Sequence, residues 1–480
     1  MIVLKFGGTS VGDSERVRSA ADIALLQPKP RVVVVSAATG VTNALLDAAR
    51  AAASGDDAKR RDRVAHIHER HAEILGGIGN DDFRNAASDV VASLHVALDA
   101  ALDEVAASGE LSERLSDRIV ATGEKCLATM MSATINDMGH AATPVFADTV
   151  IATDGRHGSA RPDRTLTRQH ADRVIRPLLD GGQIVVATGF IGFGPDGATT
   201  TMGRGGSDYS ATLLGAALDA DEVQIWTDVP GVLSADPRKV PAARVVPELG
   251  FDEAQELAHF GAKVLHPRTI RPAVARNIPV RILSTFAPDE PGTVVTQEST
   301  GTRVKAVTAL RGLIVLTLDV PELEDLAPAA SAVFRILDEQ HVEIVTVSQA
   351  SSRRRMTFLV DAVMGGCAQL QGQIEQELDD RVEMHVSCSE HVAAVAAVGA
   401  GVAGEPTSLS TMLSTLHRAG VAVLATTQQT SNVAMLVVIP DDAADRAVAA
   451  LHDRMVRPQH ATHRSRRRRS ALMAESLRVG

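Results

Sequence analysis

The 480-residue sequence is poor in cysteine and has no long apolar run. Its three cysteines are Cys126, Cys367 and Cys388, and no two have the CxxC spacing. This argues against a zinc site or a disulfide framework and favours a reducing compartment. No segment reaches the roughly 18 uninterrupted apolar residues of a membrane span, and no leader pattern follows Met1. We therefore expect a cytoplasmic protein with no membrane partner.

Aromatic residues make up only 2% of the chain, so its core must be built from Ala, Val, Leu and Ile. Hydrophobic residues at 45% and charged residues at 22% are ordinary for a soluble globular protein of several domains. The net charge of −11 argues against nucleic acid as a partner, because a duplex requires a basic face. It does not exclude an anionic small substrate, since a local field can oppose the global charge.

The first half of the chain has the pattern of an α/β domain. Short β-branched runs at 2–6 and 31–36 flank the helical spacing of SERVRSAADIALL, which predicts a β-α-β unit and a parallel sheet. From about 48 to 131 the pattern is helical and charged, and we expect a helical excursion from the sheet. Further strands are expected at 143–147, 183–193 and 221–229, and the proline and glycine spacing of 279–295 indicates a domain exit.

The C-terminal part repeats one small pattern twice. A β-α-β-β order over 313–363 is followed by the same order over 392–440, with a further helix after each. This predicts an internal duplication of a ferredoxin-like unit. The last residues, around RSRRRRS at 464–470, are basic and indicate a disordered tail.

The stretch KFGGTSVG, Lys5 to Gly12, stands where the first strand should turn into a helix. Gly7 and Gly8 allow close approach of the backbone to a ligand, and amides at a helix N-terminus attract anions. Lys5 could place its ammonium group against a phosphoryl oxygen. An ordinary turn with a solvated lysine explains the fragment equally well.

A second glycine-rich stretch surrounds an arginine. Gly203, Gly205 and Gly206 flank Arg204, and Ser207 and Asp208 lead into an amphipathic helix. Asp208 suits the first turn of that helix, so capping is its simplest role. A rigid, always charged guanidinium beside flexible backbone is better explained by recognition of a carboxylate or a phosphate.

Four weaker signals lie elsewhere. Turn residues dominate TDVPGVLSADP at 227–237, a lysine follows Gly-Ala in FGAKVLHP at 260–267, and the polar loop SAATGVTN at 36–43 ends the second strand. Glu124 stands on a helix after a glycine. Taken singly, each is compatible with a turn or a solvated surface.

Taken together, these motifs resemble the aspartate kinases. KFGGTSVG, SAATGVTN, TGE, GRGGSDYSA, WTDVPGV with ADPR, and FGAKVLHP occur in the order of that family, and the resemblance extends to about residue 457. It implies a three-layer α/β/α amino-acid-kinase domain with a mainly parallel sheet, followed by two ferredoxin-like ACT domains. The implied boundaries are 1–297 for the kinase, 303–388 and 389–457 for the ACT domains, and 458–480 for the tail. Since nothing after 457 could house a homoserine dehydrogenase, we expect a monofunctional enzyme.

The resemblance implies phosphorylation of the L-aspartate side chain by ATP with Mg²⁺, and a role for each matching residue. Lys5 would contact the transferred phosphoryl group and Asp208 would organise the active site. The remaining roles are the phosphate loop, Gly7, Gly8, Thr9 and Ser10; the aspartate site, Ser36, Thr42, Glu124, Arg204, Gly205, Gly206 and Ser207; and the nucleotide site, Thr227, Asp228, Leu233, Asp236, Lys263 and Val264. Arg204 would bind a carboxylate and Glu124 would face the amino group. No motif predicts a direct protein ligand for Mg²⁺.

Two departures from the family pattern concern ligand recognition. Leu233 stands where members often have a tyrosine that contacts the nucleotide. In the first ACT unit, Ser348, Gln349 and Ser351 match the effector segment, but three arginines follow at 353–355. The identity of the effector, lysine, threonine or neither, is therefore left open. Because ACT units usually pair edge to edge, we expect a homodimer or a higher even oligomer.

Other functions compete with this one. Another amino-acid kinase of the same fold could act on glutamate, acetylglutamate or carbamate. A catalytically inactive, amino-acid-sensing ACT protein is a second alternative, against which Lys5, Arg204, Asp208 and Lys263 are all present. A third makes the basic tail a tether to nucleic acid or membrane, which the acidic chain as a whole argues against.

Overall fold

The computed structural model describes residues 1–261, 266–298, 301, 303–322, 324, 326–350, 354–363, 365–378, 385–428 and 432–456. The chain divides into two compact units. The first comprises Met1–Val232, Val245–Ala258 and Lys263–Ser299, and the second comprises Leu233–Arg244, His259–Ala262 and Thr300–Gly480. No helix among the described residues has both the length and the apolar character needed to cross a bilayer.

Within the described residues, the first unit is built on an eight-stranded sheet in the order β3-β4-β2-β1-β7-β9-β10-β8. All neighbouring strands are parallel except β9 and β10, as predicted for a mainly parallel sheet. The strands are β1 Ile2–Phe6, β2 Arg31–Val35, β3 Ala142–Val145, β4 Ile184–Thr188, β7 Glu222–Thr227, β8 Glu248–Gly250, β9 Val280–Ser284 and β10 Thr293–Thr296. β5 Ile191–Phe193 and β6 Thr199–Thr201 form a separate hairpin.

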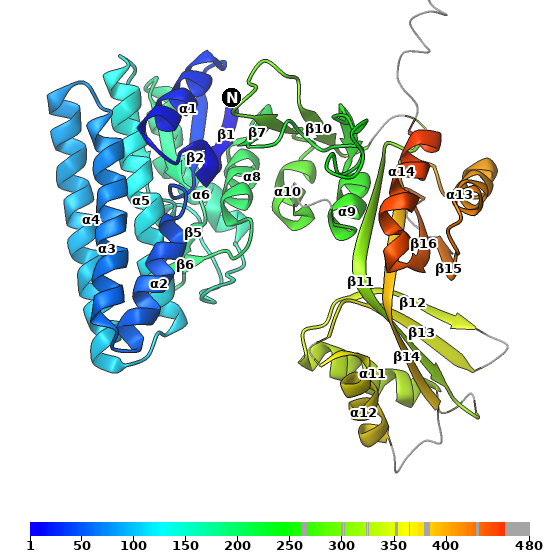
Figure 1. The fold of residues 1–480 in the computed structure, drawn as a ribbon. Helices are drawn as coiled ribbons and strands as arrows, with labels where there is room; N and C mark the ends of the chain where they lie inside the picture. Colours follow the sequence, from blue (N-terminus) through cyan, green and yellow to red (C-terminus); the bar gives the residue numbers. More distant parts are fainter. Residues whose placement is uncertain are drawn as a thin grey trace, which may run out of the picture. The chain divides into compact units, whose positions relative to one another are not determined.

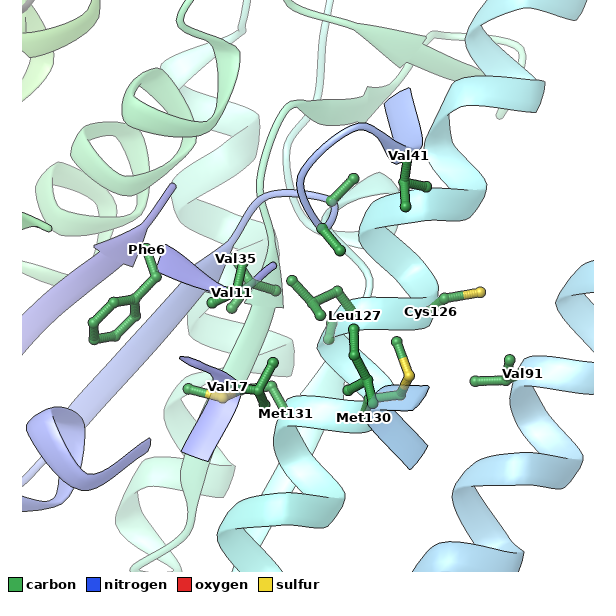
Figure 2. Close-up of a cluster of buried hydrophobic side chains, with 14 of the residues drawn as sticks. Phe6, Val11, Val17, Val35, Val41, Val91, Cys126, Leu127, Met130 and Met131 are labelled. Atoms are coloured by element: carbon green, nitrogen blue, oxygen red, sulfur yellow. The ribbon is translucent and has the colours of Figure 1, made fainter. Parts of the chain in front are cut away.

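Helices cover both faces of this sheet, which makes the three layers that the resemblance implied. Leu4 and Phe6 of β1 belong to a buried cluster with residues of α1 and α5 (Figure 2). The alternate residue Val3 approaches Gly215 of α8 on the opposite face. The helices are α1 Ser14–Leu26, α2 Val41–Ala53, α3 Asp57–Gly76, α4 Asp81–Ser108, α5 Glu113–Asp137, α6 Arg164–Val174, α7 Arg176–Asp180, α8 Gly206–Leu218, α9 Phe251–His259 and α10 Pro267–Val274. Because Val3 and Lys5 lie on the same side of the pleat of β1, the side chain of Lys5 also points toward α8.

The helical excursion is real but longer than the range 48–131 predicted for it. It begins with α2 at Val41 and ends with α5 at Asp137, and α3, α4 and α5 lie side by side (Figure 1). Short polar links with side-chain caps separate the helices; Asn80, for example, accepts hydrogen bonds from the first amides of α4. Its core uses Ala, Leu, Ile and Met in place of aromatic residues, as the composition requires.

The second unit contains a six-stranded sheet in the order β12-β13-β11-β14-β16-β15. Two strands of fourteen residues, β11 Ala306–Asp319 and β14 His385–Val398, pair antiparallel along their length. Each half has the predicted β-α-β-β order with a further helix. The other elements are α11 Leu326–Glu339, β12 Ile344–Ala350, β13 Arg355–Val360 and α12 Gly366–Leu378 in one half, and α13 Pro406–Arg418, β15 Ala425–Gln428, β16 Ala434–Pro440 and α14 Ala444–Met455 in the other.

The boundaries drawn from sequence cut through these elements. The division at 388/389 falls inside β14, whose two ends serve separate apolar cores. Ala235 and Val240, placed in the kinase range by the resemblance, belong to the core that contains α13 and α14. The second unit therefore takes residues 233–244 from a distant part of the chain, which local composition cannot reveal.

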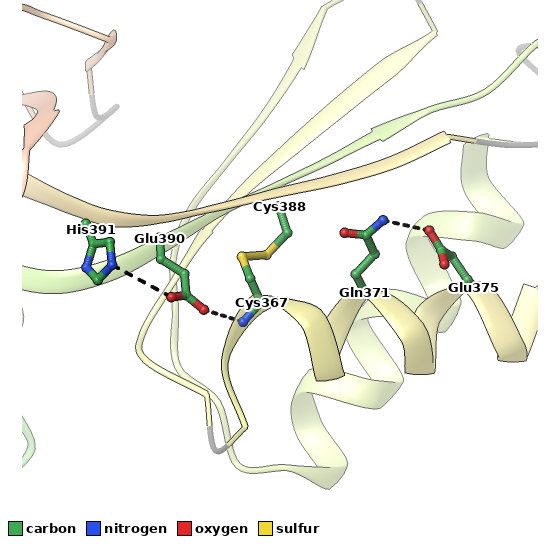
Figure 3. Close-up of a disulfide and its surroundings, with 6 residues drawn as sticks. All are labelled: Cys367, Gln371, Glu375, Cys388, Glu390 and His391. Carbon is green, nitrogen blue, oxygen red and sulfur yellow. Dashed lines mark hydrogen bonds and ion pairs between the residues drawn. A yellow bond between two sulfur atoms is a disulfide. The ribbon is translucent and has the colours of Figure 1, made fainter.

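Cys367 at the start of α12 and Cys388 on β14 form a disulfide (Figure 3). The expectation of no disulfide is thus wrong. The two cysteines are 21 residues apart, with no diagnostic spacing, and they meet because α12 packs on β14. Cysteine usage therefore no longer supports a reducing compartment. Cys126 is free and buried.

Candidate active site

A cavity of about 270 Å³ lies at the carboxyl ends of the central strands of the first unit. This is the edge at which open parallel sheets bind ligands. The side chains and glycines around it are Lys5, Ser36, Thr42, Glu124, Phe190, Gly203, Gly205, Gly206, Ser207 and Asp208. Eight of these ten were predicted as site residues, although they come from four separate motifs. Gly203 and Phe190 are the additions.

Lys5 and Asp208 form an ion pair at the floor of the cavity. Nζ of Lys5 lies 2.7 Å from Oδ1 of Asp208, and the two side chains are 11% and 17% exposed. Lys5 arrives at the end of β1 and Asp208 in the first turn of α8, so the strand and the helix N-terminus meet at this pair. An ammonium group held here, beside free amides of a helix N-terminus, provides positive potential for a phosphoryl group.

The predicted phosphate loop follows β1 as a short turn of 3-10 helix, Gly8–Ser10. A Cβ added at Gly8 would lie 2.9 Å from the carbonyl oxygen of Ala37, so a larger residue would force the loop away from the end of β2. The hydroxyl of Thr39 donates to the carbonyl of Gly8 at 2.7 Å. Glycine is required here because the loop packs directly on neighbouring backbone.

Glu124 is buried in the middle of α5, with the side chain 3% exposed. Its Oε1 accepts a hydrogen bond from the amide of Ala37 at 3.1 Å, while its Oε2 is buried with no hydrogen-bond partner among the described residues. Burial raises the pKa of this carboxyl to about 8, although the Ala37 hydrogen bond works in the opposite direction. A buried carboxyl that lines a cavity and has one unsatisfied oxygen is suited to receive an ammonium group.

The glycine-rich stretch places α8 against the cavity. Gly203 and Gly205 have φ of 72° and 69°, values that favour glycine, and Gly205 caps α8. Arg204 between them is exposed, and among the described residues its guanidinium has no ion-pair or hydrogen-bond partner. Arg204 is not among the residues that line the cavity, although Gly203 and Gly205 on either side of it are.

Phe190 of this wall, and Gly189 before it, were missed from sequence. A Cβ at Gly189 would lie 2.6 Å from Cβ of Ser207, so glycine allows β4 to approach α8 closely. Phe190, which follows it, has φ of 70°, and its amide donates to the hydroxyl of Ser210 at 2.9 Å. Backbone strain of this kind gathers at functional sites. The only sequence signal was Gly189 itself, at the end of a strand.

The predicted nucleotide residues fall in different parts of the structure. Thr227 is the last residue of β7 and Asp228 follows it; the hydroxyl of Thr227 donates to Oδ1 of Asp228 at 3.1 Å. The hydroxyl of Thr285 donates to the carbonyl of Thr227 and lies 3.1 Å from the hydroxyl of Ser10, which joins this strand end to the phosphate loop. Thr9 is exposed on that loop.

Leu233 and Asp236 belong to the second unit. Leu233 is half-buried, and Asp236 is paired with Arg238 at 2.7 Å, whose guanidinium lowers the pKa of the Asp236 carboxyl. Lys263 and Val264 lie outside the described residues, so the second predicted phosphate lysine remains a prediction.

The predicted effector residues Ser348 and Gln349 are exposed on β12, at one edge of the second unit's sheet. Ser351 lies outside the described residues. In the part of the chain that is described, no three His, Cys or carboxylate side chains converge at the cavity. That Mg²⁺ is held mainly by phosphates and water therefore remains a prediction.

The chain is similar to known proteins over most of its length. A sequence model of the amino acid kinase family matches residues 1–284, and one of the ACT domain matches 395–455. Lysine-sensitive aspartokinase 3 of Escherichia coli is 36% identical over 354 residues, covering 73% of this chain and 77% of that protein. A chloroplastic bifunctional aspartokinase/homoserine dehydrogenase of Daucus carota is 31% identical over 94% of this chain. The chain spans about half the length of that relative, 50%.

Solved structures show the same likeness over nearly the whole chain. The crystal structure of Escherichia coli aspartokinase III in complex with aspartate and ADP, in the R-state, has a TM-score of 0.78 at 29% identity and covers 95% of this chain and 100% of that one. The complex of the same enzyme with lysine and aspartate, in the T-state, has a TM-score of 0.79 at 30% identity, with the same coverage.

Proposed function

Because the chain belongs to the amino acid kinase family and, within it, to the aspartokinases, we propose that it transfers the γ-phosphoryl group of MgATP to the side-chain carboxylate of L-aspartate. The products are 4-phospho-L-aspartate and ADP, and the reaction is the first step of aspartate-family amino-acid biosynthesis. The carrying observation is the cavity that collects Lys5, Asp208, Glu124 and the Arg204 segment. The relative crystallised with aspartate and ADP supports this assignment.

The chemistry suits these residue types. The side-chain carboxyl of aspartate has an ordinary pKa of about 4, so at neutral pH it is already a nucleophile and the site needs no general base. Its oxygen attacks the γ-phosphorus while ADP leaves, and the main obstacle is the approach of an anion to a polyanion. Lys5, near the N-terminus of α8, neutralises charge where it develops, and Mg²⁺, when bound, would supply further neutralisation.

Glu124 and Arg204 orient the acceptor. Arg204 binds the α-carboxylate of aspartate, and Glu124 faces its ammonium group through the unpaired Oε2. Thr42, in the first turn of α2, and Ser207, in the first turn of α8, line the same cavity as Glu124. Opposite charges at the two ends of the site select an amino acid in one orientation.

Acceptor specificity tests this function directly. The purified full-length chain is incubated with MgATP, hydroxylamine and one acceptor, and acyl phosphate is measured as the hydroxamate. We expect activity with L-aspartate and less than a hundredth of it with glutamate or acetylglutamate. Preferred turnover of glutamate would identify another amino-acid kinase, and inactivity with every acceptor, carbamate included, would favour the amino-acid-sensing protein. Lys5→Ala serves as the matched inactive control.

We further propose that the second unit binds an amino-acid effector, lysine or threonine, and mediates homo-oligomerisation into a dimer or higher even oligomer. Support comes from the ACT-domain match and from the relative crystallised with lysine. The exposed Ser348 and Gln349 lie on β12, whose outer edge has no strand partner among the described residues. An open strand edge can pair with the same edge of a second copy.

The domain division accompanies this proposal. The first unit carries catalysis, and the second unit, which includes residues 233–244, holds the two ACT-type halves joined through β11 and β14. The basic stretch 458–480 lies outside the described residues. We also propose that the enzyme acts in the cytoplasm. Titration of lysine and threonine against activity, with light scattering to measure oligomer mass, tests both proposals. Gln349→Ala should shift the effector response without changing activity in its absence, whereas an unchanged response would exclude this segment.

A further inference from the structure

Three helices of the excursion bring a cluster of metal-ligating side chains together, away from the cavity. His68 and His71 lie on α3, His95 on α4 and Cys126 on α5. One nitrogen from His71, one from His95 and Sγ of Cys126 all lie within 4.8 Å of one another. Nδ1 of His71 and Nε2 of His95 are 2.8 Å apart, and the ring of His68 stacks on His95 with centroids 4.0 Å apart. None of these residues lines the cavity.

The cluster is poorly satisfied as a purely structural contact. His71 is 1% exposed, and its Nε2 is buried with no hydrogen-bond partner among the described residues. Nε2 of His68 is in the same state. Whichever tautomers are present, the one hydrogen bond between His71 and His95 leaves Nε2 of His71 buried without a partner among the described residues. Burying a polar atom without a partner costs about 1–3 kcal/mol of stability, and a bound ligand would offset that cost.

From this geometry we propose that His71, His95 and Cys126 bind a zinc-class transition-metal ion. Two imidazoles and a thiolate form a borderline-soft donor set, which suits Zn²⁺ and Co²⁺ and excludes Ca²⁺ and Mg²⁺. Tetrahedral bonds of about 2.0–2.3 Å place ligand atoms roughly 3.3–3.7 Å apart. The observed separations reach that range when side chains shift by about 1 Å.

The protonation states are compatible with this use. Burial lowers the pKa of His71 to about 3 and that of His95 to about 4, so both rings are neutral and able to bind a metal at physiological pH. Burial raises the pKa of Cys126 to about 12, so the free side chain is a thiol. The ion displaces that proton to solvent as the metal–sulfur bond forms, and no oxidant or reductant is needed.

Metal binding at this position would join α3, α4 and α5 through side chains. Cys126 is two residues beyond Glu124 on α5, so the ion would also fix the helix that carries the acceptor-site carboxyl. The expected consequence is a metal-dependent gain in thermal stability of the first unit. This role is separate from phosphoryl transfer, and its test does not depend on catalytic activity.

The test is a Co²⁺ titration of the full-length, chelator-stripped chain, prepared without a histidine tag and with its disulfide intact. We expect one equivalent to produce visible absorption of tetrahedral intensity and a near-ultraviolet thiolate-to-cobalt band, which Zn²⁺ then abolishes. Cys126→Ser should lose the thiolate band, and His95→Gln should weaken binding at least tenfold. Zn²⁺ should raise the melting temperature of the natural sequence but not that of Cys126→Ser.

Matched controls separate this site from others. His66→Gln changes an exposed histidine on the same helix and should bind Co²⁺ normally. Replacement of both Cys367 and Cys388 by serine should leave the thiolate band intact. The proposal is refuted if the natural chain gives no thiolate band, or if the band survives Cys126→Ser. Should Cys126→Ser fail to fold by circular dichroism, His95→Gln decides: unchanged Co²⁺ affinity in that variant refutes the site.

Discussion

Glu124 offers the sharpest test of the acceptor side, because an empty site and an occupied site require different protonation states of its carboxyl. Its pKa is raised by burial to about 8, so about nine-tenths of the carboxyls are neutral at pH 7 when no ligand is bound. An ammonium group beside the unpaired Oε2 favours the ionised form. Binding of aspartate must therefore release a proton.

The size of the effect follows from the pKa. Ionising the carboxyl before binding costs about 1.4 kcal/mol at pH 7 and about 2.7 kcal/mol at pH 6, but only about 0.4 kcal/mol at pH 8. We expect the affinity for aspartate to rise about fiftyfold between pH 6 and pH 8. At pH 7 about 0.9 proton should leave for each aspartate bound.

Isothermal titration calorimetry with ADP present, in buffers of different ionisation enthalpy, measures both quantities. Glu124→Gln should bind aspartate weakly and without this pH dependence, whereas Glu69→Gln, an exposed change on α3, should behave like the natural sequence. An affinity that is flat from pH 6 to pH 8, or a slope that survives Glu124→Gln, would refute the reasoning.

The same pKa predicts a stability effect of defined sign. The folded-state pKa of Glu124 is raised, so its contribution to stability is complete below the ordinary glutamate value of 4.5 and is lost as pH rises toward 8. The free energy of unfolding of Glu124→Gln, minus that of the natural sequence, should therefore be about 3 kcal/mol larger at pH 8 than at pH 5. Urea unfolding at the two pH values measures the difference, and a difference of the opposite sign would contradict the assigned burial.

Further variants test the remaining roles. Lys5→Ala should lower kcat about 10²–10³-fold with little change in the KM for aspartate. Arg204→Ala should raise that KM at least tenfold with kcat nearly unchanged. Steady-state kinetics measure both, and the reverse pattern would refute both roles. Gly8→Ala, which would bring a Cβ to 2.9 Å from a backbone oxygen, should lower kcat at least tenfold, while Gly76→Ala, with nothing within 4 Å, should be neutral in the same assay. Cys367→Ser opens a 21-residue disulfide loop and should cost about 3 kcal/mol in urea unfolding; an unmoved midpoint would show that the disulfide does not form.

Local signals explain why much of the fold could be predicted from the sequence. Helix α1 begins and ends where its spacing indicated, because Asp13 caps its first turn and the apolar residues repeat at helical intervals. Strand β2 is a continuous valine run that is buried along its whole length, as a parallel strand covered by helices must be. Gly203 and Gly205 take a left-handed backbone that glycine adopts without strain, and Gly8 leaves room for the carbonyl of Ala37.

The tertiary structure alone decided the roles of residues whose partners are distant in the sequence. In the sequence only the family motif TGE distinguished Glu124 from a surface glutamate; burial against the end of β2 gives its carboxyl a raised pKa. Phe190 enters the cavity wall because Gly189 lets its strand approach α8.

The same holds for Cys367, which meets Cys388 through helix–strand packing, and for His71, which meets His95 and Cys126 through three helices. Sequence therefore determined the elements and the chemistry-bearing motifs, since these depend on neighbours along the chain. Desolvation, cysteine pairing and ligand clustering depend on neighbours in space, and only folding brings those together.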